Sequence, residues 1–337
     1  MKNKENNNIY FWQESIWAQL AGAWEQQRMQ HGLLLAGPAG LGKNRFARVL
    51  AGFVMCREDR SARRPCGQCK GCALMAAGSH PDFRWVSVPE DRKTIGIEQA
   101  RDIVEWMRLT SFLAGYKVVV IDDADLLTLE ASNSLLKTLE EPAGASLLML
   151  VSKRPHALLA TIRSRCQLLR FTRPGHEAAL RWLKTQDSSA DWPRLLFLAG
   201  GAPLRALAMY RDGFADIDRQ FSADLSAIIG GSKDPVAVSM AWDKQPSSVW
   251  LEWLQTVVLG MIRARAAGTA KIKECEPVHL IQGAVNINLA RLYHYLDDLV
   301  AARKRSERGA LRTDLMTAAM LIPWACGLNY RSIYQEN

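Results

Sequence analysis

The sequence predicts an α/β domain followed by an all-α region. In the first half, short apolar runs alternate with segments of helical periodicity, and this alternation is typical of a mostly parallel sheet covered by helices. Residues 118–121 form an unbroken β-branched run, as expected of a strand that is buried on both faces. Beyond Phe171 no convincing strand pattern remains. The length of 337 residues allows two or three domains.

The elements of the first half follow one another in a regular order. A strand at 33–36 leads into a glycine-rich turn, which leads into a helix at 44–55. Apolar residues recur at helical spacing in 99–109, and a further helix at 129–139 is stopped by Pro142. The other strands are expected at 83–88, 117–121 and 146–151.

The second half is expected to be helical, beginning after the break at Pro174-Gly175. Three short helical stretches come first, at 176–186, 191–199 and 203–212. Longer helices follow at 247–266, 286–305 and 311–321. The expected layout is an α/β domain over 1–173, a small helical module over 174–213 and a helical C-terminal domain over 214–337.

The composition is that of a globular protein with an excess of positive charge. Apolar residues make up 48% of the chain and charged residues 23%, which excludes wholesale disorder, collagen-like repeats and a pure coiled coil. No apolar run approaches the ~18–20 residues of a membrane span. Residues 1–8 lack the apolar core of a signal peptide, so a cytoplasmic protein is expected. The net charge of +9 suits either an acidic partner, such as nucleic acid, or an ordinary basic protein.

Four of the seven cysteines crowd into residues 56–72. Cys66, Cys69 and Cys72 are separated by two-residue gaps, and Cys56 precedes them. In a reducing compartment such crowding indicates a metal site rather than disulfides. Four thiolates close a tetrahedral, structural zinc site, with His80 as a competitor for the place of Cys56. A redox dithiol is the alternative. The remaining cysteines are scattered: Cys166, Cys275 and Cys326.

A glycine-rich segment stands between the first strand and its helix. It matches a phosphate-binding loop at Gly37, Gly42 and Lys43, with Gly40 inside it. Backbone N–H groups of such a loop wrap phosphates, and the helix N-terminus adds positive potential. Asn44 stands where a Ser or Thr hydroxyl normally ligates Mg²⁺. ATP or ADP binding is therefore possible, hydrolysis should be impaired, and a vestigial loop is the alternative.

The acidic half of such a site follows the strand at 117–121. Asp122 is placed to bind Mg²⁺ or its water. An active ATPase of this kind usually carries Glu at the next position, where this chain has Asp123. The aspartate is shorter by one methylene, and a general base must reach the proton it removes. The residues at 44 and 123 together predict a weak or absent ATPase.

Taken together, these motifs resemble the bacterial clamp-loader subunits of the AAA+ class. His80-Pro81-Asp82-Phe83 agrees with that family, as do the stretches 116–125, 133–142 and 162–166. The resemblance covers about residues 9–212 by motif, and the rest by length and helical character. Within the family, the degenerate phosphate loop is similar to that of the delta-prime subunits of DNA polymerase III. The gamma/tau subunits also have the zinc insert and the Ser-Arg-Cys motif. The intact Lys43 favours assignment to the gamma/tau subunits.

The resemblance implies an AAA+ P-loop ATPase-type domain with a zinc insert, a three-helix lid and a helical collar domain that joins subunits. It implies the gamma/tau and delta subunits as partners, and the sliding clamp and primed DNA as contacts through the complex. A delta-prime-like chain would help load the clamp during replication. Little or no ATPase activity of its own is expected.

Three residues take roles from the resemblance alone. Arg165, in Ser-Arg-Cys, matches the arginine finger that acts in trans on ATP held by a neighbouring subunit; otherwise it is an interface residue. Ser152 ends the strand that senses the terminal phosphate, and Arg205 matches the lid arginine that senses nucleotide. A strand-end cap and a solvated lid charge are their plainer alternatives.

Two other functions remain open from the sequence. The first is a catalytically active gamma/tau-like ATPase, which differs in turning over ATP by itself. The second is a zinc-containing DNA-binding protein with a vestigial nucleotide fold, which would bind DNA tightly with a steep salt dependence.

Overall fold

The computed structural model describes residues 9–58, 64–113, 115–266, 287–307 and 313–329. Contacts divide the chain into two compact units, Met1–Pro174 and Gly175–Asn337. The first unit holds the α/β elements. The segments expected as a lid and as a collar both belong to the second unit.

The first unit is built on a five-stranded sheet in the order β2-β3-β4-β1-β5. Every pair of neighbouring strands in it runs parallel. This arrangement is the parallel α/β fold that the sequence predicts. The strands are β1 (Gly32–Ala36), β2 (Phe83–Val86), β3 (Lys117–Ile121), β4 (Ser146–Ser152) and β5 (Gln167–Arg170).

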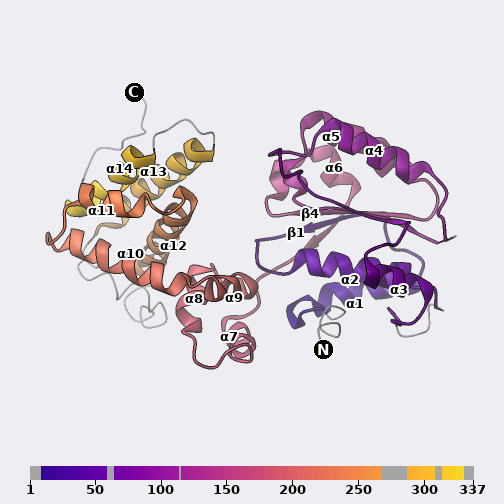
Figure 1. The fold of residues 1–337 in the computed structure, drawn as a ribbon, viewed down its shortest axis with the longest axis horizontal. Helices are drawn as coiled ribbons and strands as arrows, with labels where there is room; N and C mark the ends of the chain where they lie inside the picture. The colour runs from indigo at the N-terminus through magenta and orange to yellow at the C-terminus, as the bar shows by residue number, and fades with distance from the viewer. Residues whose placement is uncertain (1–8, 59–63, 114, 267–286, 308–312, 330–337) are drawn as a thin grey trace. The chain divides into compact units, whose positions relative to one another are not determined.

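Helices cover both faces of this sheet. Figure 1 shows α4, α5 and α6 on one face and α1, α2 and α3 on the other. The three central strands, β1, β3 and β4, are buried along their whole length, which explains why they read as continuous apolar runs. The helices are α1 (Glu14–Glu25), α2 (Lys43–Met55), α3 (Lys70–Ala77), α4 (Ile97–Arg108), α5 (Leu129–Glu140) and α6 (Ala160–Arg165).

Parallel pairing brings the carboxyl ends of the central strands to one edge. Ala36, the last residue of β1, is in register with Ser152, the last residue of β4. The loop after β1 and the residues after β4 therefore start side by side, and Gly37 donates its N–H to the carbonyl of Ser152 at 3.2 Å. Asp122 follows β3 at the same edge. The sheet topology thus gathers the predicted nucleotide-site residues of this unit.

β5 and α1 are among the elements of the first unit that the sequence analysis does not predict. β5 has four residues and lies at the edge of the sheet, where Leu168 is exposed and Leu169 is buried. Such a short segment carries too little periodicity to distinguish it from a loop. α1 precedes the first predicted strand, and only Leu20 and Trp24 of its residues are buried. Ile16, Trp17, Leu20 and Trp24 nevertheless recur at helical spacing, so this helix could have been predicted from the sequence.

The second unit contains only helices among its described residues. Two apolar cores are present, one among α7 to α9 and one formed mainly by α10 to α14. Trp250, Leu254, Val257, Val258 and Met261 are all buried on α12, as their helical spacing predicts. The first three helices are α7 (His176–Lys184), α8 (Trp192–Leu198) and α9 (Pro203–Arg211). The others are α10 (Phe214–Ile229), α11 (Pro235–Trp242), α12 (Ser247–Ala266), α13 (Leu289–Glu307) and α14 (Thr313–Ala325).

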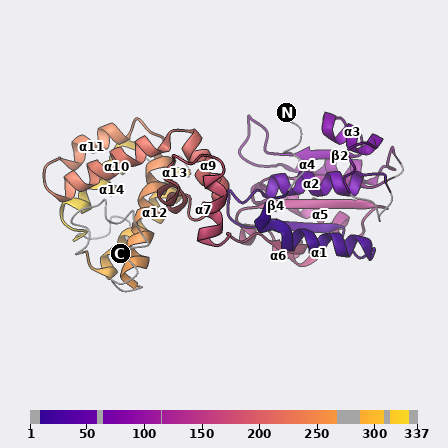
Figure 2. The ribbon, with the colours of Figure 1, turned by 90° about the horizontal axis from the view of Figure 1, so that it is seen from below.

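The sequence does not predict α10 because polar residues stand on its buried side. Asp218 accepts hydrogen bonds from Arg194 at 2.7 and 2.6 Å and from the Trp253 indole at 2.7 Å. A buried charge that is paired in this way satisfies its hydrogen bonds but interrupts the apolar pattern. Both views show α10 and α11 beside α14 (Figures 1 and 2). No helix in the described ranges is long and apolar enough to cross a membrane.

Candidate functional site

The four clustered cysteines meet at the end of α2 and the start of α3. Cys56 caps α2, Cys69 is the N-cap of α3 and Cys72 lies in its first turn. All four thiol sulfurs lie within 4.8 Å of one another. The Sγ atoms of Cys66 and Cys72 are 3.9 Å apart, and those of Cys56 and Cys69 are 4.0 Å apart. A tetrahedral site with Zn–S bonds of about 2.3 Å requires sulfur separations of roughly 3.8 Å, so the residues fit zinc.

Backbone N–H groups surround these sulfurs. Cys69 Sγ accepts from the N–H groups of Arg57 and Cys72, each at 3.4 Å. Cys66 Sγ accepts from the N–H groups of Gln68 and Cys69 at 3.5 and 3.3 Å. Partial burial acts to raise the pKa of Cys69, but these N–H donors lower it to about 6. At Cys69, donors aimed at the sulfur favour the thiolate form that binds metal, whereas burial raises the pKa of the Cys72 thiol.

His80 is not a member of the cluster. Its Nδ1 accepts the N–H of Asp82 at 3.1 Å, and among the described residues the candidate ligand group consists of the four cysteines alone. Cys166 and Cys326 belong to other parts of the structure, at the start of β5 and after α14. Cys275 lies outside the described residues. Cys56 is therefore preferred over His80 as the fourth ligand.

The predicted phosphate loop has the backbone of such a loop. Gly37, Gly40 and Gly42 all adopt positive φ angles, at 154°, 75° and 79°. A Cβ atom at Gly37 would lie 2.3 Å from the carbonyl oxygen of Phe171, so a side chain cannot be accommodated there. The loop then enters α2 at Lys43. The glycines thus retain their conformational role.

The lysine of the loop turns back onto the loop itself. Lys43 Nζ donates to the carbonyl oxygens of Gly37 and Pro38 at 2.7 and 2.8 Å. Burial of the side chain, with a smaller contribution from Lys153, lowers the pKa of Lys43 to about 8. The ammonium group thus binds carbonyl oxygens of its own loop. In a phosphate-binding loop that holds a nucleotide, the same group contacts the phosphates.

Both acidic residues after β3 are paired within the chain. Asn44 Nδ2 donates to Asp122 Oδ2 at 2.6 Å, and Lys153 Nζ lies 2.8 Å from Asp123 Oδ1. Burial and the neighbouring Asp123 raise the pKa of Asp122. The Asn44 amide therefore presents a donor to the carboxylate that would ligate Mg²⁺. A Ser or Thr hydroxyl could donate to the same carboxylate and still offer an oxygen lone pair to the ion.

A segment that the sequence reasoning missed packs against the loop. The buried Gln13 donates through Nε2 to the carbonyl oxygens of Leu41 and Gly42 at 2.8 and 3.2 Å. A Cβ at Gly42 would meet the ring of Tyr10 at 2.7 Å. In the sequence Gln13 is an ordinary polar residue. Nothing in the sequence shows that its side chain is buried against the loop.

The two expected sensor residues make other contacts. Ser152 is fully buried, and its Oγ accepts the N–H of Arg154 at 3.1 Å, which is the contact of a strand-end cap. Arg205 belongs to the second unit, where it forms an ion pair of 2.6 Å with Glu252 of α12. Neither contact requires a nucleotide.

Arg165 stands at the opposite end of the sheet from the phosphate loop. A Cβ at Gly32, the first residue of β1, would lie 3.3 Å from the Arg165 carbonyl oxygen. Gly37 follows the last residue of the same strand. With about 3.3 Å of rise per residue, the two positions are separated by roughly 16 Å. The half-buried side chain pairs with Glu140 at 2.5 Å, so it is directed away from its own loop.

Comparison with known proteins places these features in one family. A family profile described as "DNA polymerase III, delta subunit" matches residues 12–175. The delta-prime subunit of Pseudomonas aeruginosa is 31% identical over 335 residues, which cover 94% of this chain and 98% of that protein. The delta-prime subunit of Escherichia coli K12 is 30% identical, covering 93% and 94%. The tau subunit of Bacillus subtilis is 35% identical over 48% of this chain and 28% of that protein.

Among solved structures, similarity is weaker. A gamma subunit-related protein of Thermotoga maritima gives a TM-score of 0.42 at 15% identity, covering 92% of this chain and 100% of that chain. The RuvB Holliday junction branch migration motor of the same organism gives 0.39 at 18% identity, covering 62% and 61%.

Proposed function

Because the chain belongs to the delta-prime subunits of the DNA polymerase III clamp loader, we propose that it supplies Arg165 in trans to ATP held by a neighbouring subunit. It does so without hydrolysing ATP itself. In this role it helps the complex to load the sliding clamp onto primed DNA.

The observation that carries this proposal is the separation of Arg165 from its own phosphate loop. The two lie at opposite ends of β1, so the guanidinium cannot serve a nucleotide bound by the same chain. A guanidinium has a permanent charge and a planar set of donors that match phosphate oxygens. Charge that develops on a transferring phosphoryl group is stabilised by such a cation at a junction that excludes water.

The contacts of the chain's own loop support a non-hydrolysing role. Asn44 holds Asp122, Lys153 holds Asp123, and Lys43 donates to carbonyl groups of its own loop. Lys43 and Asp122, the groups that would contact ATP and Mg²⁺, thus already have partners within the chain. An aspartate at 123 that is engaged by a lysine is also a poor candidate for polarising water.

The zinc insert is proposed to be structural. Four thiolates saturate a tetrahedral ion and leave no open position for a substrate or water. Cys56, Cys66, Cys69 and Cys72 would hold the ion, which fixes the segment between α2 and α3.

The proposed partners are the gamma/tau subunits, which would hold the ATP, and the delta subunit. The clamp and primed DNA are reached through that complex. The second candidate is an ATPase of the gamma/tau type, which the intact Lys43 and the loop glycines favour. ATP turnover by the isolated chain distinguishes the two functions.

Reconstitution of the clamp loader with the Arg165→Ala variant tests the trans role. We expect the complex to assemble while DNA-stimulated ATP turnover and clamp loading fall severalfold. Trans arginines contribute about 10³–10⁵ in rate at one site, but other junctions would keep their own arginines. Arg163→Ala is the matched control, since Arg163 is an exposed arginine on the same helix. Equal rates with both variants would make Arg165 an interface residue.

A further inference from the structure

The strand β2 leaves one side of its backbone without a neighbouring strand. It lies at an edge of the sheet, where it pairs with β3 alone. Val118 donates its N–H to the Asp82 carbonyl oxygen at 2.9 Å, and Asp122 donates to that of Val86 at 2.8 Å. Because the backbone groups of successive residues in a strand point alternately to its two sides, those of Trp85 point outward. No hydrogen bond joins them to any residue in the part of the chain that the structure describes.

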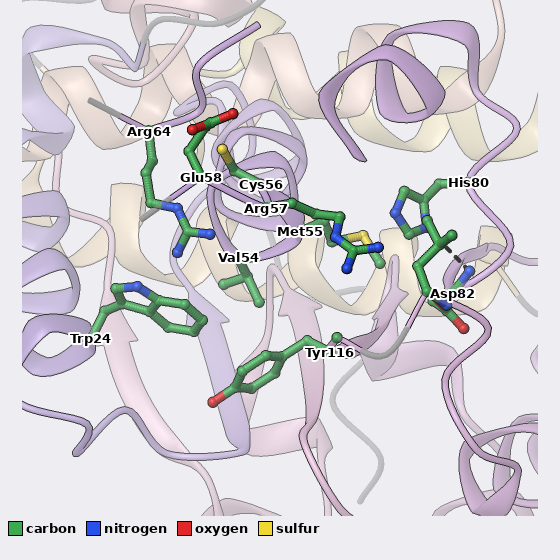
Figure 3. A pocket seen from close by; sticks show the side chains of 12 residues that line it. Trp24, Val54, Met55, Cys56, Arg57, Glu58, Arg64, His80, Asp82 and Tyr116 are labelled. Carbon is green, nitrogen blue, oxygen red and sulfur yellow. Dashed lines mark hydrogen bonds between the residues drawn. The ribbon is translucent and has the colours of Figure 1, made fainter. Parts of the chain in front are cut away.

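The open stretch of this edge has a defined end on each side. Before it, Phe83 donates its N–H to the His80 carbonyl oxygen at 3.1 Å. His80 Nδ1 also accepts the N–H of Asp82 at 3.1 Å, a contact that Figure 3 shows as a dashed line. After it, the Ser87 carbonyl oxygen accepts a hydrogen bond from the Gln99 side chain at 3.3 Å. The backbone groups between these two ends are enough to pair with a short extended peptide.

Two exposed arginines flank this edge, one on each face of the sheet. The guanidinium carbon of Arg48, on α2, lies 4.1 Å from the ring centroid of Trp85. That of Arg84 lies 4.8 Å from the ring centroid of Trp106, on α4. Figure 1 shows α2 and α4 on opposite faces of the sheet. Among the described residues, neither arginine has a carboxylate as a partner in an ion pair.

The charge and geometry of the edge indicate what fits it. Stacking on a tryptophan fixes a guanidinium by its face and leaves the N–H groups in its plane available. Carboxylates match these donors. Because the side chains of a strand alternate between the two faces, a strand added along β2 would present one side chain toward Arg48 and the next toward Arg84. Acidic residues at two consecutive positions of an extended segment would therefore meet both arginines.

Two other roles of such an edge fit less well. Charged side chains on an edge strand serve in many proteins to prevent pairing, but here each guanidinium lies on a tryptophan ring on one face of the sheet. A single strand of nucleic acid would satisfy the arginines. Its phosphate oxygens only accept hydrogen bonds, so they would leave the outward carbonyl of Trp85 unpaired. A peptide backbone offers both donors and acceptors.

We propose that the outer edge of β2 is a docking site for an extended acidic segment of a partner protein, which adds to the sheet as a further strand. Backbone hydrogen bonds would supply part of the affinity, and the two arginines would select for acidic side chains. This site lies apart from the cysteine cluster and from Arg165, and it depends on neither the zinc nor the trans role.

Fluorescence anisotropy of a labelled peptide, Thr-Val-Asp-Glu-Val-Thr, tests the site on the full chain. The peptide should bind, and its affinity should fall about tenfold in the double variant Arg48→Gln/Arg84→Gln, because two solvent-accessible ion pairs are lost. Arg163→Gln is the matched control. That exposed arginine lies on α6, which contacts β5 at the other edge of the sheet, so its affinity should stay within about twofold.

Two further measurements separate strand pairing from attraction between charges. A peptide of the same sequence with methylated backbone nitrogens keeps its charge but loses its donors, so it should not bind. Hydrogen exchange followed by NMR should show that the peptide protects the Trp85 amide. Failure of the acidic peptide to bind, equal binding of the methylated peptide, or an unprotected Trp85 amide would overturn the docking site. Tighter binding of oligothymidine, weakened by the same double variant, would assign the edge to nucleic acid instead.

Discussion

Arg165 and Glu140 form an ion pair between the last residues of two helices. Nη2 of the arginine lies 2.5 Å from Oε1 of the glutamate, and Nη1 also donates to the Thr161 carbonyl oxygen at 3.0 Å. The side chains are 35% and 48% exposed, respectively. The arginine proposed to act on a neighbour's ATP is therefore held by an acidic residue of its own chain.

The stability of the chain should depend little on this pair. Glu140→Gln is expected to lower the free energy of unfolding by less than about 1 kcal/mol, because exposed ion pairs are weakened by solvent and salt. Urea denaturation of the isolated chain measures the change. A loss well above that value would mean that the pair supports the fold, and a defect of Arg165→Ala would then include a folding component.

One zinc ion per chain is expected in protein purified without chelator, and elemental analysis measures it. Cys69→Ser should release the ion, because it removes one of the four sulfurs of the cluster. The Cys69 sulfur also accepts two backbone N–H groups, which favour its thiolate form. The parallel sheet should survive, since the insert lies outside the strands. Cys326→Ser serves as the control, as that exposed thiol is remote in sequence and outside the cluster.

ATP turnover by the isolated chain should be negligible. The side chains at 44 and 123 are engaged with Asp122 and Lys153, so neither Mg²⁺ nor the attacking water is positioned. A coupled ADP-release assay measures the rate. A turnover above ~1 s⁻¹, the low end for ordinary enzymes, that is lost in Lys43→Ala would assign the chain to the active ATPase class.

Acid should weaken the fold through Asp82. This carboxylate is 1% exposed and accepts from the Phe112 and Leu113 N–H groups and the Ser111 hydroxyl at 2.8 to 2.9 Å. Burial acts to raise its pKa, but these donors and the charge of Lys117 lower the pKa overall. A carboxyl whose folded pKa is depressed stabilises the fold above its unfolded pKa of about 3.9, and the contribution is lost as the pH falls through the folded pKa.

Asp82→Asn should therefore cost about 1–3 kcal/mol at pH 7, the range for leaving buried donors unsatisfied. The difference between the variant and the unaltered protein should shrink below about pH 4. Urea denaturation at several pH values gives both numbers. Asp102→Asn, at an exposed position of α4, is the control. If the difference in the free energy of unfolding did not change with pH, the charge of Asp82 would not be the cause of the stabilisation.

Local patterns predicted the parts of the molecule whose partners are near in sequence or whose strands are wholly buried. The strand at 117–121 was located to the residue, and the spacing of the cysteines selected the four thiols that meet. Contacts between segments that are far apart in the sequence could not be predicted. Examples are Gln13 on the loop at Leu41, the edge strand β5, and α10 with its paired Asp218. In each of these, the partner that satisfies a polar group comes from elsewhere in the chain.

The position of Arg165 and the phosphate loop at the two ends of β1 gives the domain a polarity. Suppose that the end of one domain that carries Arg165 meets the end of the next domain that carries the phosphate loop. Such a contact is heterologous, because two different surfaces meet, and its repetition builds a row of subunits that all point in one direction. A chain whose own loop is closed by Lys43, Asn44 and Asp122 can donate at such a contact but gains nothing as an acceptor. Under the proposed function, such a chain would therefore stand at the end of the row, because no neighbour would need to supply an arginine to its own loop.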